Sequence, residues 1–301
     1  NICTAKALNA TMAGFYAAYH GREGLERIAR HIHSAAVILA EEIQKLGYKL
    51  KVNKFFDTLR FELPEGVSQA AVRDAALEQE INLFYCNCGC GKVVGLSTDE
   101  KINEKEINTL IGIFAKAAGK TAAHVQFLDD RTVLDPVMLR DDEILQQSVF
   151  NIYHSETGMM RYMKNLERRD ISLGSCTMKL NAAVEMLPIT WPELGAIHPF
   201  APMSQAEGYQ QMIRETEEML CKVTGFAGCS LMPNSGAAGE YSALMVIRQY
   251  HISRGEGHRN VILIPASAHG TNPASSSMAG FKILVTATDP EGNIDVEDFR
   301  K

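Results

Sequence analysis

The chain has 301 residues, of which 46% are hydrophobic and 22% charged, and its formal net charge is −6. This length is enough for two domains with buried cores, and the composition is that of an ordinary soluble globular protein. No block of Lys and Arg points to nucleic acid, and no apolar run approaches the roughly 20 residues that span a bilayer. The composition therefore argues against a nucleic-acid-binding protein and against a membrane protein.

The first residues, Asn1 to Lys6, contain neither a starting Met nor the basic and apolar regions of a signal peptide. We therefore expect the chain to be an internal part of a longer protein. Its seven Cys are an odd number, which favours free thiols in a reducing compartment. Cys86, Cys88 and Cys90 alternate too closely for the usual spacing of zinc ligands, so we predict no metal site there.

Residues 1–120 are predicted to form a small α/β domain. Apolar residues at helical spacing run from Leu25 to Leu46, and Gly47 ends the run. Alternating and short apolar runs predict strands at residues 48–52, 58–63, 81–85 and 92–96.

Two further helices of this domain carry capping signals. Ser68 is expected to cap a helix that extends to about Gln79, and Asn103 with Glu106 three residues later predicts a capping box. Ala71, Ala75 and Leu77 give the first helix partial apolar support, and the apolar stripe of the second consists of Ile107, Leu110, Ile111 and Phe114.

Residues 121–185 show no sustained period and are predicted to be an irregular linker. A connection of this length is either disordered or wrapped over a surface, and its aromatic and Met content favours wrapping. Within it, Ser155 is expected to start a short helix ahead of Met159 and Tyr162.

Residues 186–301 return to α/β order and are predicted to be an incomplete large domain. The expected elements are a helix at 207–223 ended by Gly225, a strand at 229–232, a helix from Ser235 to about 250, strands at 261–264 and 281–287, and a helix near Val296.

The run of small residues from Ser235 through Gly236 and Ala237 is the first candidate site. It lies between a predicted strand and a predicted helix, where backbone N–H groups and the helix dipole favour an anion. The run lacks the Gly-Lys-Ser/Thr ending of a Walker loop, which argues against nucleotide triphosphates. The alternative is a tight turn in which small residues only avoid clashes.

His269 is the second candidate, because it follows a predicted buried strand. Its small neighbours leave space for an imidazole to stack on a flat heterocycle, although a lone His is often structural. Cys176 and Lys179 together offer a nucleophile and a Schiff-base amine, with a packed loop as the alternative.

Several runs in the chain together resemble the P-protein of the glycine cleavage system, glycine decarboxylase (glycine dehydrogenase, decarboxylating). The resemblance covers essentially the whole chain, and several runs in one order are more specific than any single motif. The matching runs are Asn1–Ala5, His154–Thr157, Gly174–Asn181, Pro188–Glu193, His198–Phe200, Pro233–Ala237, Gly239–Tyr241 and Ser267–Ser275.

The resemblance implies an α/β fold of the fold-type I, aminotransferase-like class that binds pyridoxal 5′-phosphate (PLP). This family has two homologous halves, of which the second keeps the cofactor. Residues 1–120 would be the small C-terminal domain of the first half, and residues 121–185 would link the halves. Residues 186–301 would begin the large, PLP-binding domain of the second half.

The resemblance also implies roles for particular residues. Ser235, Gly236 and Ala237 would hold the PLP phosphate, and His269 would stack on the pyridine ring as the catalytic residue. The residues expected to line the glycine site are His154, Ser155, Thr271 and Asn272.

The implied reaction releases CO₂ from glycine, with PLP delocalising the resulting charge, and passes the aminomethyl group to the lipoyl arm of H-protein. Glycine and lipoylated H-protein are the implied partners, and the implied assembly is a homodimer or a pseudo-dimer of halves. The implied location is the cytoplasm of a bacterium or the mitochondrial matrix of a eukaryote.

Three departures from the family pattern stand out. The lysine that binds PLP covalently and the aspartate that pairs with its ring nitrogen are expected after Lys301, so we predict that this chain alone is inactive. Leu173 joins Gly174 without the several residues that the family has between them, and Gly158 replaces a usual Glu.

Two alternatives stay open at this point. The chain could be a non-catalytic interaction or subunit fragment that completes a partner's site. It could also come from another fold-type I PLP enzyme, which the segments at Trp191–Pro192 and His198–Phe200 disfavour.

Overall fold

The computed structural model describes all residues except 1–3, 87–90 and 170–182. Contacts divide the chain into two compact units, which we describe separately. The N-terminal unit comprises Gly14–Ile171, and the C-terminal unit comprises Ser172–Lys301 together with Asn1–Ala13. The three-part division expected from the sequence stays a prediction.

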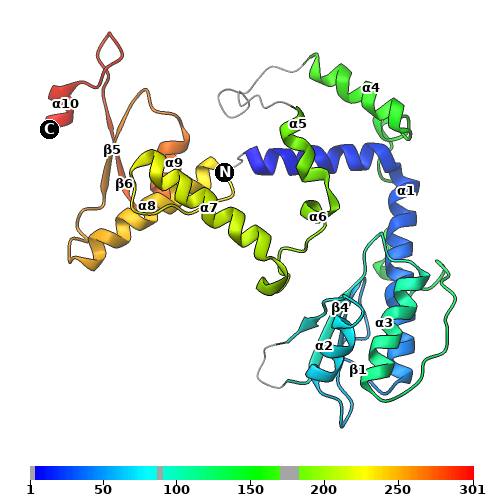
Figure 1. The fold of residues 1–301 in the computed structure, drawn as a ribbon. Helices are drawn as coiled ribbons and strands as arrows, with labels where there is room; N and C mark the ends of the chain where they lie inside the picture. The colour runs from blue at the N-terminus through cyan, green and yellow to red at the C-terminus, as the bar shows by residue number, and fades with distance from the viewer. Residues whose placement is uncertain (1–3, 87–90, 170–182) are drawn as a thin grey trace. The chain divides into compact units, whose positions relative to one another are not determined.

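The N-terminal unit is built on a four-stranded antiparallel sheet of order β1-β2-β4-β3 (Figure 1). Its helices supply apolar faces to one core. The elements in chain order are α1 (Thr4–Lys45, whose first residues belong to the other unit), β1 (Lys49–Leu50), β2 (Thr58–Glu62), α2 (Gln69–Leu77), β3 (Phe84–Tyr85), β4 (Val93–Ser97), α3 (Glu104–Ala117) and α4 (Glu156–Glu167), with short 3-10 turns at Pro136–Met138 and Ser148–Phe150.

The capping signals of this unit are confirmed. Ser68 accepts a hydrogen bond from the backbone N–H of Ala71, so α2 begins where the sequence predicts. Asn103 and Glu106 form the reciprocal capping box at the start of α3. Such caps satisfy N–H groups that have no partner within the helix, which makes these starts readable from sequence.

The bounds of several predicted elements in this unit differ from the structure. Helix α1 begins well before Leu25, and the strands predicted at 48–52 and 81–85 form only over Lys49–Leu50 and Phe84–Tyr85. Val72 and Ala76 are buried with Ala75 in α2, whereas Leu77 is 45% exposed. The face of a short helix is set by the surface it packs on, and the core of the unit receives the side containing Val72.

The segment 125–132 wraps the surface of the N-terminal unit, as the sequence indicates for part of the linker. The backbone of Val125 exchanges two hydrogen bonds with the Asn108 side chain, at 2.8 and 2.9 Å. The backbone of Arg131 exchanges two with the Ser34 hydroxyl, at 3.0 and 3.1 Å. Side chains of α3 and α1 therefore supply hydrogen bonds to this stretch of backbone, which lies outside any helix or strand.

Helix α1 has a kink at Gly21, where φ is 60° and ψ is −172°. This backbone conformation is essentially restricted to glycine. A Cβ atom at this position would lie 2.7 Å from the Phe150 carbonyl oxygen and 2.8 Å from Cε1 of His154. The kink therefore depends on glycine for both its conformation and its close packing.

Tyr48 gives the core of the N-terminal unit a pH-sensitive contact. Its hydroxyl donates to the Phe114 carbonyl at 2.9 Å, and burial raises the pKa of Tyr48 to about 12 from the ordinary 10.0. The stabilisation is complete below about pH 10 and is lost as the pH rises toward 12, because the unfolded phenol ionises first.

We expect Tyr48→Phe to lower the free energy of unfolding by about 1 kcal/mol at neutral pH, because the Phe114 carbonyl loses a donor. The variant should also lose less stability than the parent chain between about pH 10 and pH 12. Denaturant titrations across that range measure both effects. Tyr16→Phe, which removes an exposed hydroxyl, is the control and should keep the alkaline loss of the parent chain.

The C-terminal unit contains a parallel pair of strands joined through a helix. Val261 of β5 pairs with Lys282 of β6, and the register continues to Pro265 and Thr286. The elements in chain order are α5 (Ala183–Met186), a 3-10 turn (Leu187–Thr190), α6 (Pro192–Gly195), a 3-10 turn (Met203–Gln205), α7 (Glu207–Thr224), α8 (Gly236–Ser253), β5 (Val261–Pro265), α9 (Thr271–Met278), β6 (Lys282–Thr286) and α10 (Val296–Arg300).

The predicted strand at residues 229–232 is not formed. These residues have no regular structure, and Met232 is 87% exposed. In the part of this unit that the structure describes, the sheet consists of β5 and β6 paired with each other. An apolar run becomes a strand only when a neighbouring strand accepts and donates its backbone hydrogen bonds.

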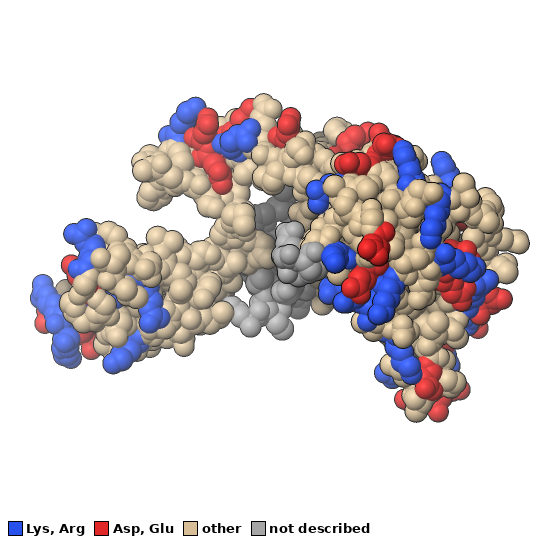
Figure 2. Space-filling view, turned by 90° about the horizontal axis from the view of Figure 1, so that it is seen from below, with Lys and Arg blue, Asp and Glu red and all other residues tan. Residues whose placement is uncertain are grey.

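Both units combine helices with sheet, so the predicted α/β class is confirmed. On the face seen in Figure 2, Lys and Arg side chains are interspersed with Asp and Glu rather than gathered into one patch. None of the described helices is long and apolar enough to cross a membrane.

Candidate functional site

The turn before α8 presents two backbone N–H groups at the start of a helix. Ser235 has an extended backbone, and its hydroxyl accepts from the N–H of Ala238 at 3.2 Å. The N–H groups of Gly236 and Ala237 precede the first residue that can bond within the helix. They lie at the positive end of the α8 dipole, where a phosphate is favoured.

The same turn is open. Gly236 is exposed, and Cβ atoms built at Gly236 or Gly239 would meet no atom within 4 Å. A ligand can therefore approach the backbone here without displacing a side chain. The structure supports an accessible turn more than one in which the glycines serve only to avoid clashes.

His269 lies in the loop between β5 and α9, and its ring is exposed. Its Nδ1 atom accepts from the backbone N–H of Thr271 at 3.2 Å and lies 2.7 Å from the Thr271 hydroxyl. A backbone N–H can only donate, so Nδ1 is the acceptor and the neutral ring carries its proton on Nε2. Thr271 thereby fixes the orientation of the His269 ring.

The Ser235 turn and the His269 loop lie at the same end of two neighbouring helices. Ser275 of α9 donates to the Glu240 carboxylate of α8 at 3.1 Å. Farther along, the Arg248 guanidinium of α8 donates to the Ala279 carbonyl. In both helices the second contact lies C-terminal to the first. Therefore α8 and α9 run side by side and start at the same end.

The other predicted substrate residue of this loop, Asn272, is exposed, and its carbonyl accepts from the Ser276 hydroxyl within α9. Thr271 directs its hydroxyl to His269 and is half-buried. Both residues belong to the first turn of α9. They therefore lie next to His269 in the chain and at the same end of the helix pair.

His154 and Ser155 belong to the N-terminal unit, and each makes a contact there. Nδ1 of His154 donates to the Tyr19 carbonyl at 2.7 Å, beside the kink of α1 at Gly21. Ser155 caps α4 by accepting from the N–H of Gly158, as the helix signal predicts. Their place in a glycine site stays a prediction.

Cys176, Lys179 and the short junction at Leu173–Gly174 lie outside the described residues, as do Cys88 and Cys90. Among the residues that the structure does describe, no group of three or more His, Cys, Asp or Glu side chains could hold a metal ion.

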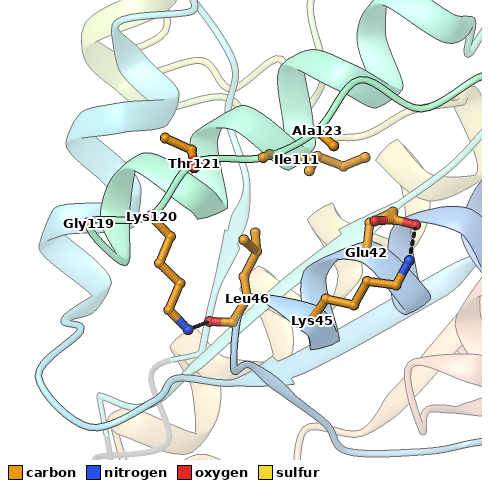
Figure 3. Close-up of a pocket in the computed structure, with 9 residues that line it drawn as sticks. Glu42, Lys45, Leu46, Ile111, Gly119, Lys120, Thr121 and Ala123 are labelled. Atoms are coloured by element: carbon orange, nitrogen blue, oxygen red, sulfur yellow. Dashed lines mark hydrogen bonds and ion pairs between the residues drawn. The ribbon is translucent and has the colours of Figure 1, made fainter.

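A cavity of about 530 Å³ lies in the N-terminal unit, lined by the end of α1, Ile111 in the middle of α3 and residues 119–123 (Figure 3). Its two ammonium groups already have partners. Lys45 contacts Glu42 at 2.6 Å, and Lys120 donates to the Leu46 carbonyl at 2.7 Å. The cavity therefore offers no unpaired cation to a ligand.

Sequence reasoning missed two structural contributors near the candidate residues. Glu240 was noticed as part of a motif without a role, and Gly21 was not singled out. Both act through distant partners, Ser275 and His154, which no local pattern reveals. An unusual glycine inside a helical run was the one available signal for Gly21.

Together, these features define an α/β protein in which a small-residue turn at a helix N-terminus and an exposed, oriented His lie at the same end of a helix pair. Comparison with known proteins shows what the chain resembles. The family model described as glycine cleavage system P-protein matches residues 1–114.

Relatives match over the full length of the chain. It is 53% identical to the glycine dehydrogenase (decarboxylating) of Bacteroides thetaiotaomicron, 52% to that of Flavobacterium johnsoniae and 49% to that of Paraburkholderia xenovorans. All of this chain is covered in each case, and it spans about a third, 32%, of the length of these relatives. The chain is therefore similar along its whole length to enzymes of this name, as the sequence motifs indicate.

Proposed function

We propose that this chain is part of a PLP-dependent glycine dehydrogenase (decarboxylating), the P-protein of a glycine cleavage system. The observation that carries the proposal is the 53% identity over the whole chain to an enzyme of that name. The Ser235 turn and the His269 loop support it, because they suit the phosphate and the ring of this cofactor. The fold is then fold-type I, with β5, α9 and β6 in the large domain.

The residues present fit the phosphate end of PLP. The N–H groups of Gly236 and Ala237 would donate to the phosphate, with Ser235 holding the start of α8 in place. Bound PLP supplies an electron sink for the charge left when glycine loses CO₂. His269 would lie flat on the ring of the cofactor, and Thr271 would hold His269 in that orientation.

The remaining predicted residues belong to the substrate side of the proposal. The residues proposed for the glycine site are Thr271, Asn272, His154 and Ser155. Lipoylated H-protein would accept the aminomethyl group, and the assembly would be a homodimer or a pseudo-dimer of halves. The named relatives are bacterial, which favours the cytoplasm over the mitochondrial matrix.

A binding experiment tests the cofactor site without lysine chemistry. Pyridoxine 5′-phosphate has no aldehyde, so it cannot react with surface lysines. We expect the chain to bind it at least about tenfold more tightly than pyridoxine, because charge-assisted hydrogen bonds to the phosphate anchor it. Titration calorimetry measures both affinities. Equal affinities, or no binding of either compound, would overturn the proposed cofactor site.

The activity is tested separately. In the presence of PLP, glycine and lipoylated H-protein, we expect no exchange of the glycine carboxyl carbon with bicarbonate by this chain alone. The reason is that the covalent lysine is expected outside it. Exchange catalysed by this polypeptide alone would refute the prediction that it is inactive.

A further inference from the structure

The contact between Glu240 and Ser275 is unusual in the C-terminal unit because it joins an exposed carboxylate to a buried hydroxyl. Ser275 is only 1% exposed, and its Oγ donates to Glu240 Oε2 at 3.1 Å. Without the Glu240 acceptor, the buried Ser275 hydroxyl would have no hydrogen bond to replace those that it makes with water in the unfolded chain, which would destabilise the fold. The contact therefore fixes the distance between α8 and α9 at this point.

This contact lies near both candidate loops. Glu240 follows Ser235 by five residues, and Ser275 follows His269 by six. Because a helix rises about 1.5 Å per residue, the first residues of α8 and α9, Gly236 and Thr271, each lie roughly 6 Å from the contact along the helix axis. A change in the spacing of the helices here is transmitted directly to the two loops.

We propose that Glu240 is a positioning residue for the candidate cofactor site. Through Ser275, it sets the separation between the N–H groups at the start of α8 and the imidazole of His269. This inference rests on the proposed function, and it assigns Glu240 a role in spacing the site rather than in touching the ligand.

Direct binding by Glu240 is disfavoured by charge. A carboxylate repels a phosphate dianion, so a Glu near the start of α8 opposes an anionic ligand unless another interaction compensates. The hydrogen bond that Ser275 donates to Glu240 is such an interaction. It requires of residue 240 only an oxygen that accepts. A neutral amide that keeps this oxygen should therefore serve the same purpose.

The test compares three variants by their affinity for pyridoxine 5′-phosphate. We expect Glu240→Ala to bind about tenfold more weakly than the parent chain, the effect of one net hydrogen bond. Glu240→Gln should bind at least as tightly as the parent chain, because its amide oxygen accepts from Ser275 and its charge is gone. If Glu240→Gln binds as weakly as Glu240→Ala, the spacing role is wrong.

Arg248→Met is the matched control. It removes a second side-chain hydrogen bond, from α8 to the residue that ends α9, which lies two turns farther from the loops. We expect this variant to melt at a lower temperature but to keep the affinity of the parent chain. A loss of affinity equal to that of Glu240→Ala would show that any weakening of the helix pair suffices, which would overturn the positioning role.

The experiment separates the two hypotheses. If the parent chain does not bind pyridoxine 5′-phosphate, the proposed cofactor site fails. If the parent chain binds it and Glu240→Ala binds equally well, the cofactor site stands and the positioning role of Glu240 fails.

Discussion

Gly236→Asp is expected to lower the affinity of the chain for pyridoxine 5′-phosphate by about ten- to hundredfold. The new carboxylate would stand at the first residue of α8, beside the N–H groups proposed to hold the phosphate. Repulsion between the Asp carboxylate and the phosphate, partly screened by solvent, corresponds to about 1.4–2.8 kcal/mol. The chain itself has room for a side chain here, because a Cβ atom at Gly236 meets no other atom within 4 Å.

Gly236→Asn is the matched control, since it has the same shape without the charge. It should bind the compound much more tightly than Gly236→Asp. The Asp variant should also be as stable as the Asn variant or more so, because a carboxylate at a helix N-terminus stabilises it. Affinity and melting temperature would then move in opposite directions. If the Asp and Asn variants bind equally well, the phosphate does not lie at this turn.

Gly21→Ala is expected to lower the free energy of unfolding of the N-terminal unit by about 3 kcal/mol. Roughly 1–3 kcal/mol comes from holding alanine at φ 60° and ψ −172°. More comes from overlap with the Phe150 carbonyl oxygen, which belongs to backbone and cannot rotate away. The bond between His154 and the Tyr19 carbonyl should be lost with the kink.

Gly14→Ala, in the same helix, is the control, and it is expected to change the free energy of unfolding in the opposite direction. Gly14 has a negative φ and open space around its position, so alanine should stabilise α1 by up to about 1 kcal/mol. Denaturant unfolding gives both values, and the imidazole resonances of His154 report on the kink. A Gly21→Ala variant as stable as the parent chain would mean that the kink is not needed in the fold.

The predicted starts and ends of helices were the most successful part of the sequence analysis. Ser68, Asn103 and Ser155 cap helices as expected, and Gly225 ends α7 in a left-handed conformation with φ of 76°. These signals are local, because each depends on hydrogen bonds within one turn of the residue. They need no knowledge of the rest of the fold.

Predictions that depended on a neighbouring element were less successful. The apolar run at 229–232 has the composition of a strand but no strand beside it. Leu77 is apolar and at helical spacing, yet the core takes up Val72 and Ala76 instead. In both cases tertiary contacts outweigh local propensity.

The sequence by itself determined the family resemblance, the capped turn at Ser235 and the loop that carries His269. These properties reside in residues adjacent in the chain, whose backbone hydrogen bonds close over a few positions. Only the tertiary structure decided that both loops start at the same end of α8 and α9, and that Gly21 and His154 meet. Those arrangements come from the Glu240–Ser275 contact and the kink of α1, which join positions separated by 35 and 133 residues. No local pattern encodes such distances, because they follow from packing of the whole unit.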